Sequence, residues 1–311
     1  HQCGMPKQDA DWIHCSGAGM NEVINRSCAR SHQFTGSSTV AEHLAQSTAG
    51  KIFIEDAGFD WKILGPDASA EHLEYVAWQS DQDAYAASGQ KCSAQSILFA
   101  HENWVNAGLF AQLQTLAARR SLQDLTVGPI LTVNNEQLNQ HRDALLKIPG
   151  AKLLFGGAPL AEHNIPHFYG AYEPTAIHVP LEHIHRSETF ELVCTEMFAP
   201  FQVVTTWNDA QLPMLLDICE RMEQHLTAAV VSNDAHFVQH ILAHTVNGTT
   251  YAGLRARTTG APQNHWFGPA GDPRSAGIGT PEAIRMVWSC HREIIRDIGP
   301  VPSAWTLPPS S

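Results

Sequence analysis

The fold and the chemistry of this chain are best approached from one stretch, Ala87-Ser88-Gly89-Gln90-Lys91-Cys92-Ser93-Ala94-Gln95. Gly89 permits a tight backbone turn and leaves room for a substrate beside it. Lys91 places positive charge next to the thiol of Cys92, and positive charge lowers a thiol pKa and favours the nucleophilic thiolate. The stretch therefore predicts that Cys92 is a covalent nucleophile. The alternative is a small buried apolar residue, which is the usual role of a free cysteine.

Three further stretches accompany the first: Phe34-Thr35-Gly36-Ser37-Ser38-Thr39-Val40, Ile54-Glu55-Asp56-Ala57-Gly58 and Glu196-Met197-Phe198-Ala199-Pro200. The four stretches resemble, in the same order, the aldehyde dehydrogenase motifs F-T-G-S-x-x-V, L-E-L-G-G, G-Q-x-C and E-x-F-G-P. The resemblance covers nearly the whole chain. It is greatest to family 12 of these enzymes, the plant-type delta-1-pyrroline-5-carboxylate dehydrogenases, and the longer stretches 55–67 and 258–273 carry that finer resemblance.

The resemblance implies an α/β fold, that of the aldehyde dehydrogenases. Residues 1–66 would form the second half of a Rossmann-like NAD-binding domain, 67–285 an α/β catalytic domain, and 286–311 a return segment and oligomerisation tail. The opening Cys3-Gly4-Met5-Pro6 is similar to an A-G-x-P run that the family carries inside its coenzyme domain. We therefore expect the first part of that domain, with the family's ribose-binding Lys and oxyanion-stabilising Asn, to be missing from this sequence.

The composition is that of a globular protein, with 43% hydrophobic and 16% charged residues among 311. The formal charge of −12 and the lack of a dense Lys/Arg cluster argue against a nucleic-acid or anionic-membrane partner. Apolar runs such as residues 228–231 are far too short to span a bilayer. Seven cysteines without a C-x-x-C pair argue against a disulfide framework or structural zinc, and fit a reducing compartment.

Alternating helix and strand patterns predict a parallel sheet. Helices are expected at residues 20–31, 39–47, 70–86, 105–118 and 212–224, and strands at 51–54, 96–100, 151–155, 175–179 and 227–231. Phe34-Thr35-Gly36 is expected to be a turn, and Glu55 to stand at the carboxyl end of its strand, where ligand sites cluster in such sheets. The glycine- and proline-rich residues 253–280 predict a functional loop.

Glu55 is the candidate general base by the resemblance. After hydride leaves a thiohemiacetal on Cys92, a thioester remains, and a water must lose a proton to hydrolyse it. A carboxylate in an apolar pocket has a raised pKa, which suits that task. The alternative is a solvated acid at a strand end, and Asp56 is the neighbouring rival. The backbone N–H of Cys92 is the expected oxyanion donor.

The coenzyme residues implied by the resemblance are Gly36, Ser37, Glu196 and Phe198, and the coenzyme is NAD. Gly36 and Ser37 would meet its phosphate at a helix N-terminus, where free N–H groups favour anions. Glu196 would accept hydrogen bonds from ribose hydroxyls and Phe198 would pack on the nicotinamide. The alternative for Gly36 and Ser37 is an ordinary helix cap. The alternatives for Glu196 and Phe198 are a loop acid and a core phenylalanine. Ala199 replaces a family glycine in this loop.

Ser93, Gly260 and Ala261 resemble the anchor with which glutamate-semialdehyde dehydrogenases bind a substrate α-carboxylate, through a hydroxyl and two backbone N–H groups. Phe267 would wall the same pocket. The alternative for residues 259–261 is an ordinary turn. His236, His240 and His244 recur every four residues and offer possible metal ligands, but no H-E-x-x-H pattern supports them. A solvated helix face is the prediction, and no metal site is assigned.

The implied activity is NAD-dependent oxidation of L-glutamate γ-semialdehyde, in equilibrium with pyrroline-5-carboxylate, to glutamate in proline catabolism. The resemblance also implies a homo-oligomer in the mitochondrial matrix, although the chain carries no visible targeting segment. Two alternatives remain open. One is another semialdehyde dehydrogenase, for example one acting on succinate semialdehyde. The other is a non-catalytic fragment that serves as an assembly or interaction subunit through unpaired strand edges.

Overall fold

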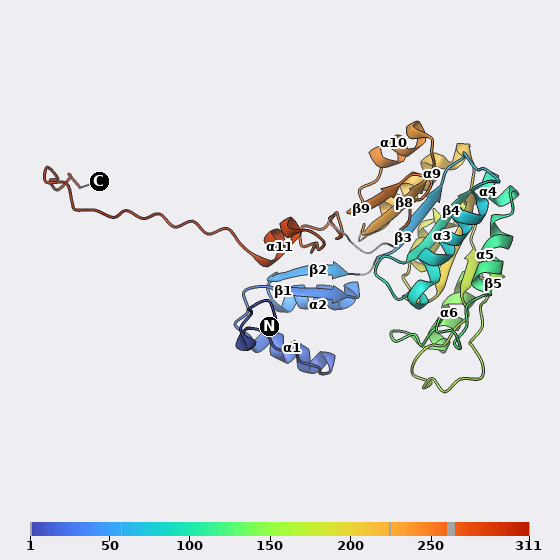
Figure 1. The fold of residues 1–311 in the computed structure, drawn as a ribbon, viewed down its shortest axis with the longest axis horizontal. Coiled ribbons are helices and arrows are strands. Elements are labelled where there is room, and N and C mark those ends of the chain that lie inside the picture. The colour runs from blue at the N-terminus through green and yellow to red at the C-terminus, as the bar shows by residue number, and fades with distance from the viewer. Residues whose placement is uncertain (1, 57, 224, 260–264, 311) are drawn as a thin grey trace.

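The structure is a computed structural model, and it describes residues 2–56, 58–223, 225–259 and 265–310. Its two sheets lie in different parts of the molecule (Figure 1): a small sheet near the N-terminus and a large sheet that contains the other strands of the described residues. Gly260 and Ala261, expected at the substrate anchor, lie outside the described residues.

The small unit contains a two-stranded parallel sheet. Its elements are η1 (Lys7–Asp9), α1 (Gly17–Arg26), β1 (His32–Gly36), α2 (Ser38–Ser47) and β2 (Ile52–Asp56). Phe34-Thr35-Gly36 was expected to be a turn, but it forms β1, because its backbone pairs with β2 in a register that sets Gly36 opposite Asp56. The helix expected at residues 20–31 begins three residues earlier, after the N-cap Ser16, and ends at Arg26.

The large sheet has the strand order β5-β6-β7-β4-β3-β8-β9, and its described neighbours are parallel except for β5 and β6. The strands are β3 (Asp60–Leu64), β4 (Gln95–His101), β5 (Lys152–Phe155), β6 (Thr175–His178), β7 (Phe201–Trp207), β8 (Thr227–Val231) and β9 (Thr249–Ala252). The expectation of a parallel sheet is therefore confirmed apart from one edge. Strands β3, β7 and β9 were missing from the sequence prediction.

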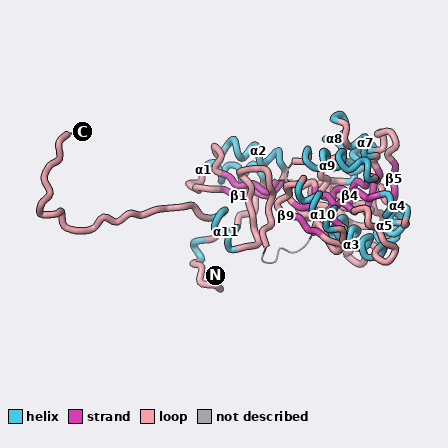
Figure 2. The backbone as a smooth tube through the Cα atoms, turned by 90° about the horizontal axis from the view of Figure 1, so that it is seen from above, coloured by secondary structure: helices cyan, strands magenta, loops and turns pink. Residues whose placement is uncertain are grey.

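Helices cover both faces of the large sheet (Figure 2), and side chains alternate between two cores along each central strand. On β3, Trp61 and Ile63 join one core, and Leu64 joins the other. The helices are α3 (Leu73–Tyr85), η2 (Ala86–Gly89), α4 (Glu102–Asn106), α5 (Leu109–Ala117), α6 (Asn135–Leu145), α7 (Leu181–Ile184), α8 (Ser187–Val193), η3 (Asp209–Gln211), α9 (Leu212–Arg221), α10 (Ala235–Ala243) and α11 (Pro281–Trp288).

Two expectations about element boundaries differ from the structure. The single helix expected at residues 105–118 is two helices, α4 and α5, because Gly108 adopts a left-handed conformation with φ of 100°. Strand β3 pairs with β4 and β8, so strand pairing groups residues 60–64 with the large sheet rather than with the first unit. The sequence alone assigned them to 1–66 because their partners lie far away in the chain.

The residues after α11 extend away from both sheets in Figures 1 and 2, and residues 289–310 are exposed. Helix α11 crosses the boundary expected at residues 285/286. Among the residues described, no helix is both long enough and apolar enough to cross a bilayer.

The turn that leads to Cys92 has unusual backbone geometry. Ala87, Ser88 and Gly89 follow α3 with φ values of 56°, 58° and 66°. Two side chains hold this turn against the segment 128–131: Gly128 donates its N–H to Ser88 Oγ at 2.8 Å, and Gln90 contacts the backbone of residues 129 and 131. Left-handed residues cost free energy, so the surrounding contacts must maintain them.

Replacing Gly89 with alanine is expected to destabilise the fold by about 2–5 kcal/mol. A Cβ at this position would lie 2.1 Å from the backbone oxygen of Ala199, and the φ of 66° is unfavourable for alanine. Denaturant unfolding measures the change. Gly108→Ala is the matched control, since its φ is 100° but a Cβ there meets no atom within 4 Å. It is expected to cost only about 1–2 kcal/mol. Equal losses for the two variants would show that the close approach of Ala199 has no energetic consequence.

Candidate active site

Three carboxyl side chains, which come from distant parts of the chain, surround the thiol of Cys92. Cys92 lies in the turn before β4, Glu55 lies at the carboxyl end of β2, and Asp60 begins β3. Glu196 lies in the connection between α8 and β7. All three carboxyl groups act electrostatically on the Cys92 thiol. The structure therefore brings together the residues of three separate sequence motifs, at the junction of the small and large sheets.

Burial and negative charge raise the pKa of Cys92. Burial is the largest cause, Glu55 follows, and Asp60 and Glu196 add to the effect, so that the pKa reaches about 12. The expectation that Lys91 lowers this pKa is wrong. The Lys91 ammonium lies within electrostatic reach of the thiol, but burial lowers its own pKa and the surrounding carboxylates outweigh it. At neutral pH the thiol therefore needs a base before it can attack.

The side chain of Glu55 is suitably placed to be that base. It is 8% exposed and forms a hydrogen bond with Cys92, in which the thiol donates to the carboxylate. Burial raises the pKa of Glu55, and the thiol opposes the shift by stabilising the charged form. A carboxylate with a raised pKa and a direct contact with the thiol can accept its proton.

Asp56, the rival acid, has different neighbours. Successive side chains of a strand point to opposite faces of the sheet, so Glu55 and Asp56 of β2 diverge. Asp56 accepts a hydrogen bond from Ser38 at the start of α2. Burial raises its pKa, and that hydrogen bond opposes the shift. The geometry therefore distinguishes the two adjacent acids: Glu55 meets the thiol, and Asp56 meets a helix N-terminus.

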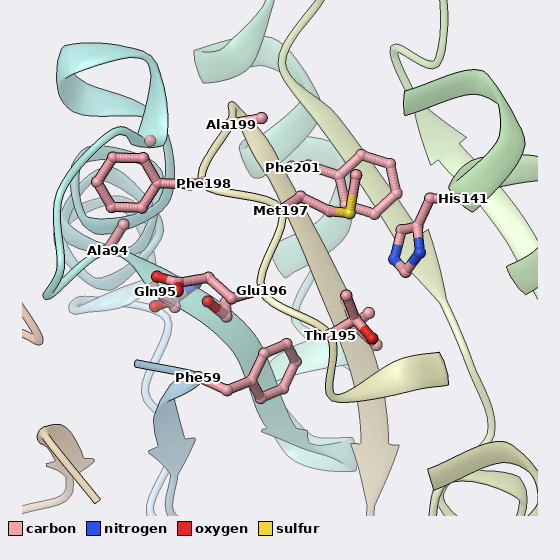
Figure 3. A pocket seen from close by; sticks show the side chains of 13 residues that line it. Phe59, Ala94, Gln95, His141, Thr195, Glu196, Met197, Phe198, Ala199 and Phe201 are labelled. Carbon is pink, nitrogen blue, oxygen red and sulfur yellow. The ribbon is translucent and has the colours of Figure 1, made fainter. Parts of the chain in front are cut away.

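Glu196 is one of the residues that line a small pocket with both polar and apolar walls (Figure 3). Phe59, His141 and Phe198 line this pocket with it, and the free space is only about 10 Å³, close to the room for one water. Burial raises the pKa of Glu196 to about 8, although the N–H of Gly58 donates a hydrogen bond to the carboxylate. Phe198 has a φ of 49°, a conformation that is uncommon outside glycine and costs free energy.

The N-terminus of α2 provides a second candidate binding element. Ser37 is the N-cap, and its side chain makes no capping hydrogen bond, so the first-turn N–H groups of the helix remain available to an anion. Gly36 precedes it, and a Cβ there would lie 2.6 Å from the Phe34 ring. A helix N-terminus without a side-chain cap suits a phosphate, and the half-buried carboxylate of Glu196 can accept hydrogen bonds from ribose hydroxyls. The described residues thus fit two parts of a dinucleotide.

Two of the residues expected at the substrate site are described. Ser93 is buried directly after the nucleophile candidate. Phe267 is also buried and forms a short antiparallel bridge with Ile278. The backbone hydrogen bonds of Phe267 join it to Ile278 rather than to the turn that carries Cys92. Its role as a wall of the substrate pocket therefore stays a prediction.

Two residues near the thiol were missed from the sequence. Asp60 is completely buried, and its Oδ1 accepts a hydrogen bond from the N–H of Thr227 at 2.7 Å. A Cβ on Gly58 would lie 2.8 Å from the backbone oxygen of Cys92, so only glycine allows this approach. Gly58 belongs to a motif already singled out and could have been found there. Asp60 could not, because its proximity to Cys92 arises from pairing of β3 with the large sheet.

The histidines at 236, 240 and 244 lie on or just after α10 and are exposed. The rings of His240 and His244 are 4.4 Å apart, and His244 Nδ1 contacts the backbone oxygen of His240 at 2.8 Å. Within the part of the chain that the structure describes, no three His, Cys, Asp or Glu side chains gather in a way that could hold a metal ion.

Comparisons with known proteins identify the family. A family profile described as "Aldehyde dehydrogenase family" matches residues 1–272. The chain is 63% identical over its whole length to a "Probable aldehyde dehydrogenase" of Linum usitatissimum, of which it covers 56%. It is 60% identical to "Delta-1-pyrroline-5-carboxylate dehydrogenase 12A1, mitochondrial" of Arabidopsis thaliana, again covering all of the chain and 56% of that protein. The chain thus spans about half the length of the curated relatives it matches.

Solved structures support the same fold. A mutant of Proline Utilization A from Bradyrhizobium japonicum aligns with a TM-score of 0.74 at 22% identity, over 91% of this chain and 28% of that one. Aldehyde dehydrogenase 21 of Physcomitrella patens aligns with a TM-score of 0.68 at 17% identity, over 86% of this chain and 53% of that one. The predicted aldehyde dehydrogenase fold is therefore confirmed. Members of the family generally depend on NAD(P) and act on aldehydes. With its profile matched over most of its length, the chain belongs to the aldehyde dehydrogenase family.

Proposed function

We propose that this chain supplies the catalytic residues of an NAD-dependent oxidation of L-glutamate γ-semialdehyde to glutamate. The observation that carries the proposal is the hydrogen bond between the Cys92 thiol and the buried Glu55 carboxylate. It pairs a nucleophile with a base, and the family supplies the reaction class. The substrate rests on the 60% identity to the relative named as a delta-1-pyrroline-5-carboxylate dehydrogenase.

The proposed reaction begins with proton transfer from the Cys92 thiol to Glu55. The thiolate attacks the aldehyde carbonyl and forms a thiohemiacetal, while the backbone N–H of Cys92 donates to the developing oxyanion. The chemistry that bound NAD would supply is that of an acceptor for the hydride that leaves the former carbonyl carbon. A thioester on Cys92 is then left. Glu55, having released its first proton to solvent, takes a proton from a water, and the water oxygen attacks the thioester carbon. The Cys92 sulfur leaves and takes back the proton from Glu55, and the acid product loses its own proton to solvent.

The proposed coenzyme contacts come from the N-terminus of α2 and from the segment between α8 and β7. Gly36 and Ser37 would hold phosphate at the N-terminus of α2, and Glu196 and Phe198 would hold the nicotinamide ribose and ring. NAD rather than NADP is part of this proposal. So are a homo-oligomeric assembly and a location in the mitochondrial matrix, since the relative from Arabidopsis thaliana is named as mitochondrial.

The proposed substrate site reads the α-carboxylate of the aldehyde. Ser93 would donate through its hydroxyl, Gly260 and Ala261 through their N–H groups, and Phe267 would close the pocket. We call Ser93, Gly260 and Ala261 together the carboxylate anchor. A panel of glutamate semialdehyde, succinate semialdehyde and propanal tests the assignment with the native enzyme. A higher kcat/KM for succinate semialdehyde would favour the other semialdehyde activity, and no turnover of any aldehyde would favour an assembly subunit.

Ser93→Ala is expected to raise KM for glutamate semialdehyde by about tenfold, because it removes one hydrogen bond to a charged group. The KM for propanal, which has no carboxylate, is expected to stay within about twofold. Steady-state kinetics of NADH formation measure both. Ala261→Pro removes an N–H donor and is expected to shift the same ratio further. If both variants lose equal amounts with both aldehydes, these residues do not bind the carboxylate.

A further inference from the structure

A buried ion pair between β3 and α3 has no place in the proposed reaction. Lys62 on β3 and Asp83 on α3 are both completely buried, and Lys62 Nζ lies 2.6 Å from Asp83 Oδ2. Taking two charges out of water is costly, and an apolar pair of similar size is often as stable. The stability of the fold therefore gives little reason for this pair, and its other contacts are more informative.

Asp83 also binds a segment far away in the sequence. Its Oδ2 accepts the backbone N–H of Thr258 at 2.9 Å, and its Oδ1 accepts the hydroxyl of Thr259 at 2.8 Å. Gln79 of the same helix donates to Oδ1 at 3.2 Å. One carboxylate thus joins β3, α3 and the segment that follows β9. Lys62 pairs with the same carboxylate, and hydrogen bonds to a charged acceptor are stronger than those between neutral groups.

The two ends of this link are close in the chain to residues of the proposed reaction site. Asp83 is in the last turn of α3, directly before the left-handed turn that leads to Cys92. Its charge also acts on Lys91, the neighbour of the thiol. Thr259 is the residue immediately before the proposed anchor position Gly260. The link therefore joins the helix that carries the nucleophile turn to the chain that leads into the carboxylate anchor.

We propose that Asp83, charge-balanced by Lys62, is a positioning residue that sets the specificity of the enzyme for a carboxylate-bearing aldehyde. It holds Thr258 and Thr259 against the end of α3, and so fixes the described residues that directly precede the carboxylate anchor in the chain. A displacement of the anchor by about 1 Å is enough to weaken productive binding. This inference rests on the proposed function, because it assumes that the carboxylate anchor exists.

Thr259→Val tests the link with little change in shape. The variant removes the hydroxyl that binds Asp83 and keeps the branched side chain. We expect KM for the preferred carboxylate-bearing aldehyde to rise about tenfold, with kcat and the KM for propanal each within about twofold. Thr259→Ser keeps the hydroxyl and is expected to restore the wild-type ratio of the two KM values. A merely structural role would lower the melting temperature without changing that ratio.

The double variant Lys62→Met/Asp83→Leu provides a second test in the native enzyme. It removes both buried charges together, so no unpaired charge is left in the core. A folded double variant with a raised KM ratio supports the proposal, and one with the wild-type ratio overturns it. If the double variant does not fold, the two Thr259 variants decide. An unchanged ratio of the two KM values in Thr259→Val overturns the proposal. The proposal is also overturned if Thr259→Val and Thr259→Ser change that ratio equally.

The failure of this inference can be distinguished from the failure of the proposed function. If the wild-type enzyme prefers succinate semialdehyde, the proposed substrate is wrong, and the Thr259 variants are judged on that aldehyde instead. If the wild-type enzyme shows no preference for carboxylate-bearing aldehydes over propanal, the positioning role is overturned as well. If the preference exists and Thr259→Val leaves it unchanged, only the role of Asp83 is lost.

Discussion

Replacing Cys92 with alanine is expected to lower the rate of aldehyde oxidation by about 10⁴-fold or more, since removal of a covalent nucleophile leaves only binding and orientation. No thiohemiacetal can form without the sulfur, so no hydride donor arises from the aldehyde. NADH formation followed by absorbance measures the loss. Coenzyme binding, followed by titration of protein fluorescence, is expected to remain within about twofold, because the proposed phosphate and ribose contacts come from other segments.

Cys194→Ala is the matched control for this experiment. Burial raises the pKa of Cys194 to about 12, the same value as for Cys92. The two thiols differ in that Glu55 acts on the pKa of Cys92, whereas the charged group that acts on the pKa of Cys194 is Arg221. Activity of the control is expected within about twofold of wild type. Turnover that persists in Cys92→Ala would sink the covalent mechanism, and loss in both variants would indicate damage to the fold.

The raised pKa of Cys92 also gives this experiment a pH signature. A thiol is alkylated as its thiolate, so the rate of alkylation of Cys92 by iodoacetamide is expected to rise about tenfold per pH unit. An unperturbed thiol levels off above its pKa of about 8.5, whereas Cys92, with a pKa of about 12, is expected to keep rising through pH 10. Mass spectrometry of the labelled peptide follows this one residue. A plateau near neutral pH would contradict the surrounding of the thiol by three carboxylates.

Glu55→Gln is expected to separate the two halves of the reaction, with a loss of about 10²–10⁴-fold in the steady state. The amide cannot deprotonate water, so the thioester accumulates. A burst of NADH is then expected before a slow steady state, and rapid-quench measurement of the acyl-enzyme follows the same intermediate. The amide also cannot take the thiol proton, so the burst itself is expected to be slower than in wild type and to speed up as pH rises.

Asp56→Asn is the control for the neighbouring acid. Asp56 contacts Ser38 rather than the thiol, so its loss is expected to fall on the KM for the coenzyme and to leave no burst. The pH profile adds a second readout. Because Glu55 must be ionised to act and its pKa is raised from 4.5, activity is expected to fall with decreasing pH through that raised pKa. This limb is absent in Glu55→Gln. A burst in Asp56→Asn instead of Glu55→Gln would reassign the base.

Local signals in the sequence were sufficient for several features. Ser37 and Ser38 before residues 39–47 predicted a helix start, and α2 begins one residue earlier than expected, at Ser38. Gly89 predicted a tight turn beside the thiol, and its φ is 66°. These predictions succeeded because helix caps and turns depend on residues that are neighbours in the chain. The prediction of the overall fold rested on the resemblance to the aldehyde dehydrogenases, whose four motifs occur in the same order in this sequence.

Features that depend on distant partners could not be predicted in the same way. Strand β3 is five residues long and carries a lysine and an aspartate, so its pattern alone does not indicate a buried central strand. It is one because β4 and β8 pair with it on both sides. The prediction of one helix at residues 105–118 was wrong for a local reason. The apolar pattern continues across Gly108, but the left-handed backbone of Gly108 interrupts the helix.

The sequence by itself determined which residue types are available to react: a thiol in a glycine turn, an acid at the end of a strand, and an acid and an aromatic ring in one loop. Only the tertiary structure decided their electrostatic environment. The charge of Lys91 next to Cys92 predicted a lowered thiol pKa, but burial and the carboxylates of Glu55, Asp60 and Glu196 raise it. Likewise, Asp83 meets Thr259 across 176 positions of the chain. Solvent exclusion and charge act through space, so proximity in the fold outweighs proximity in the chain.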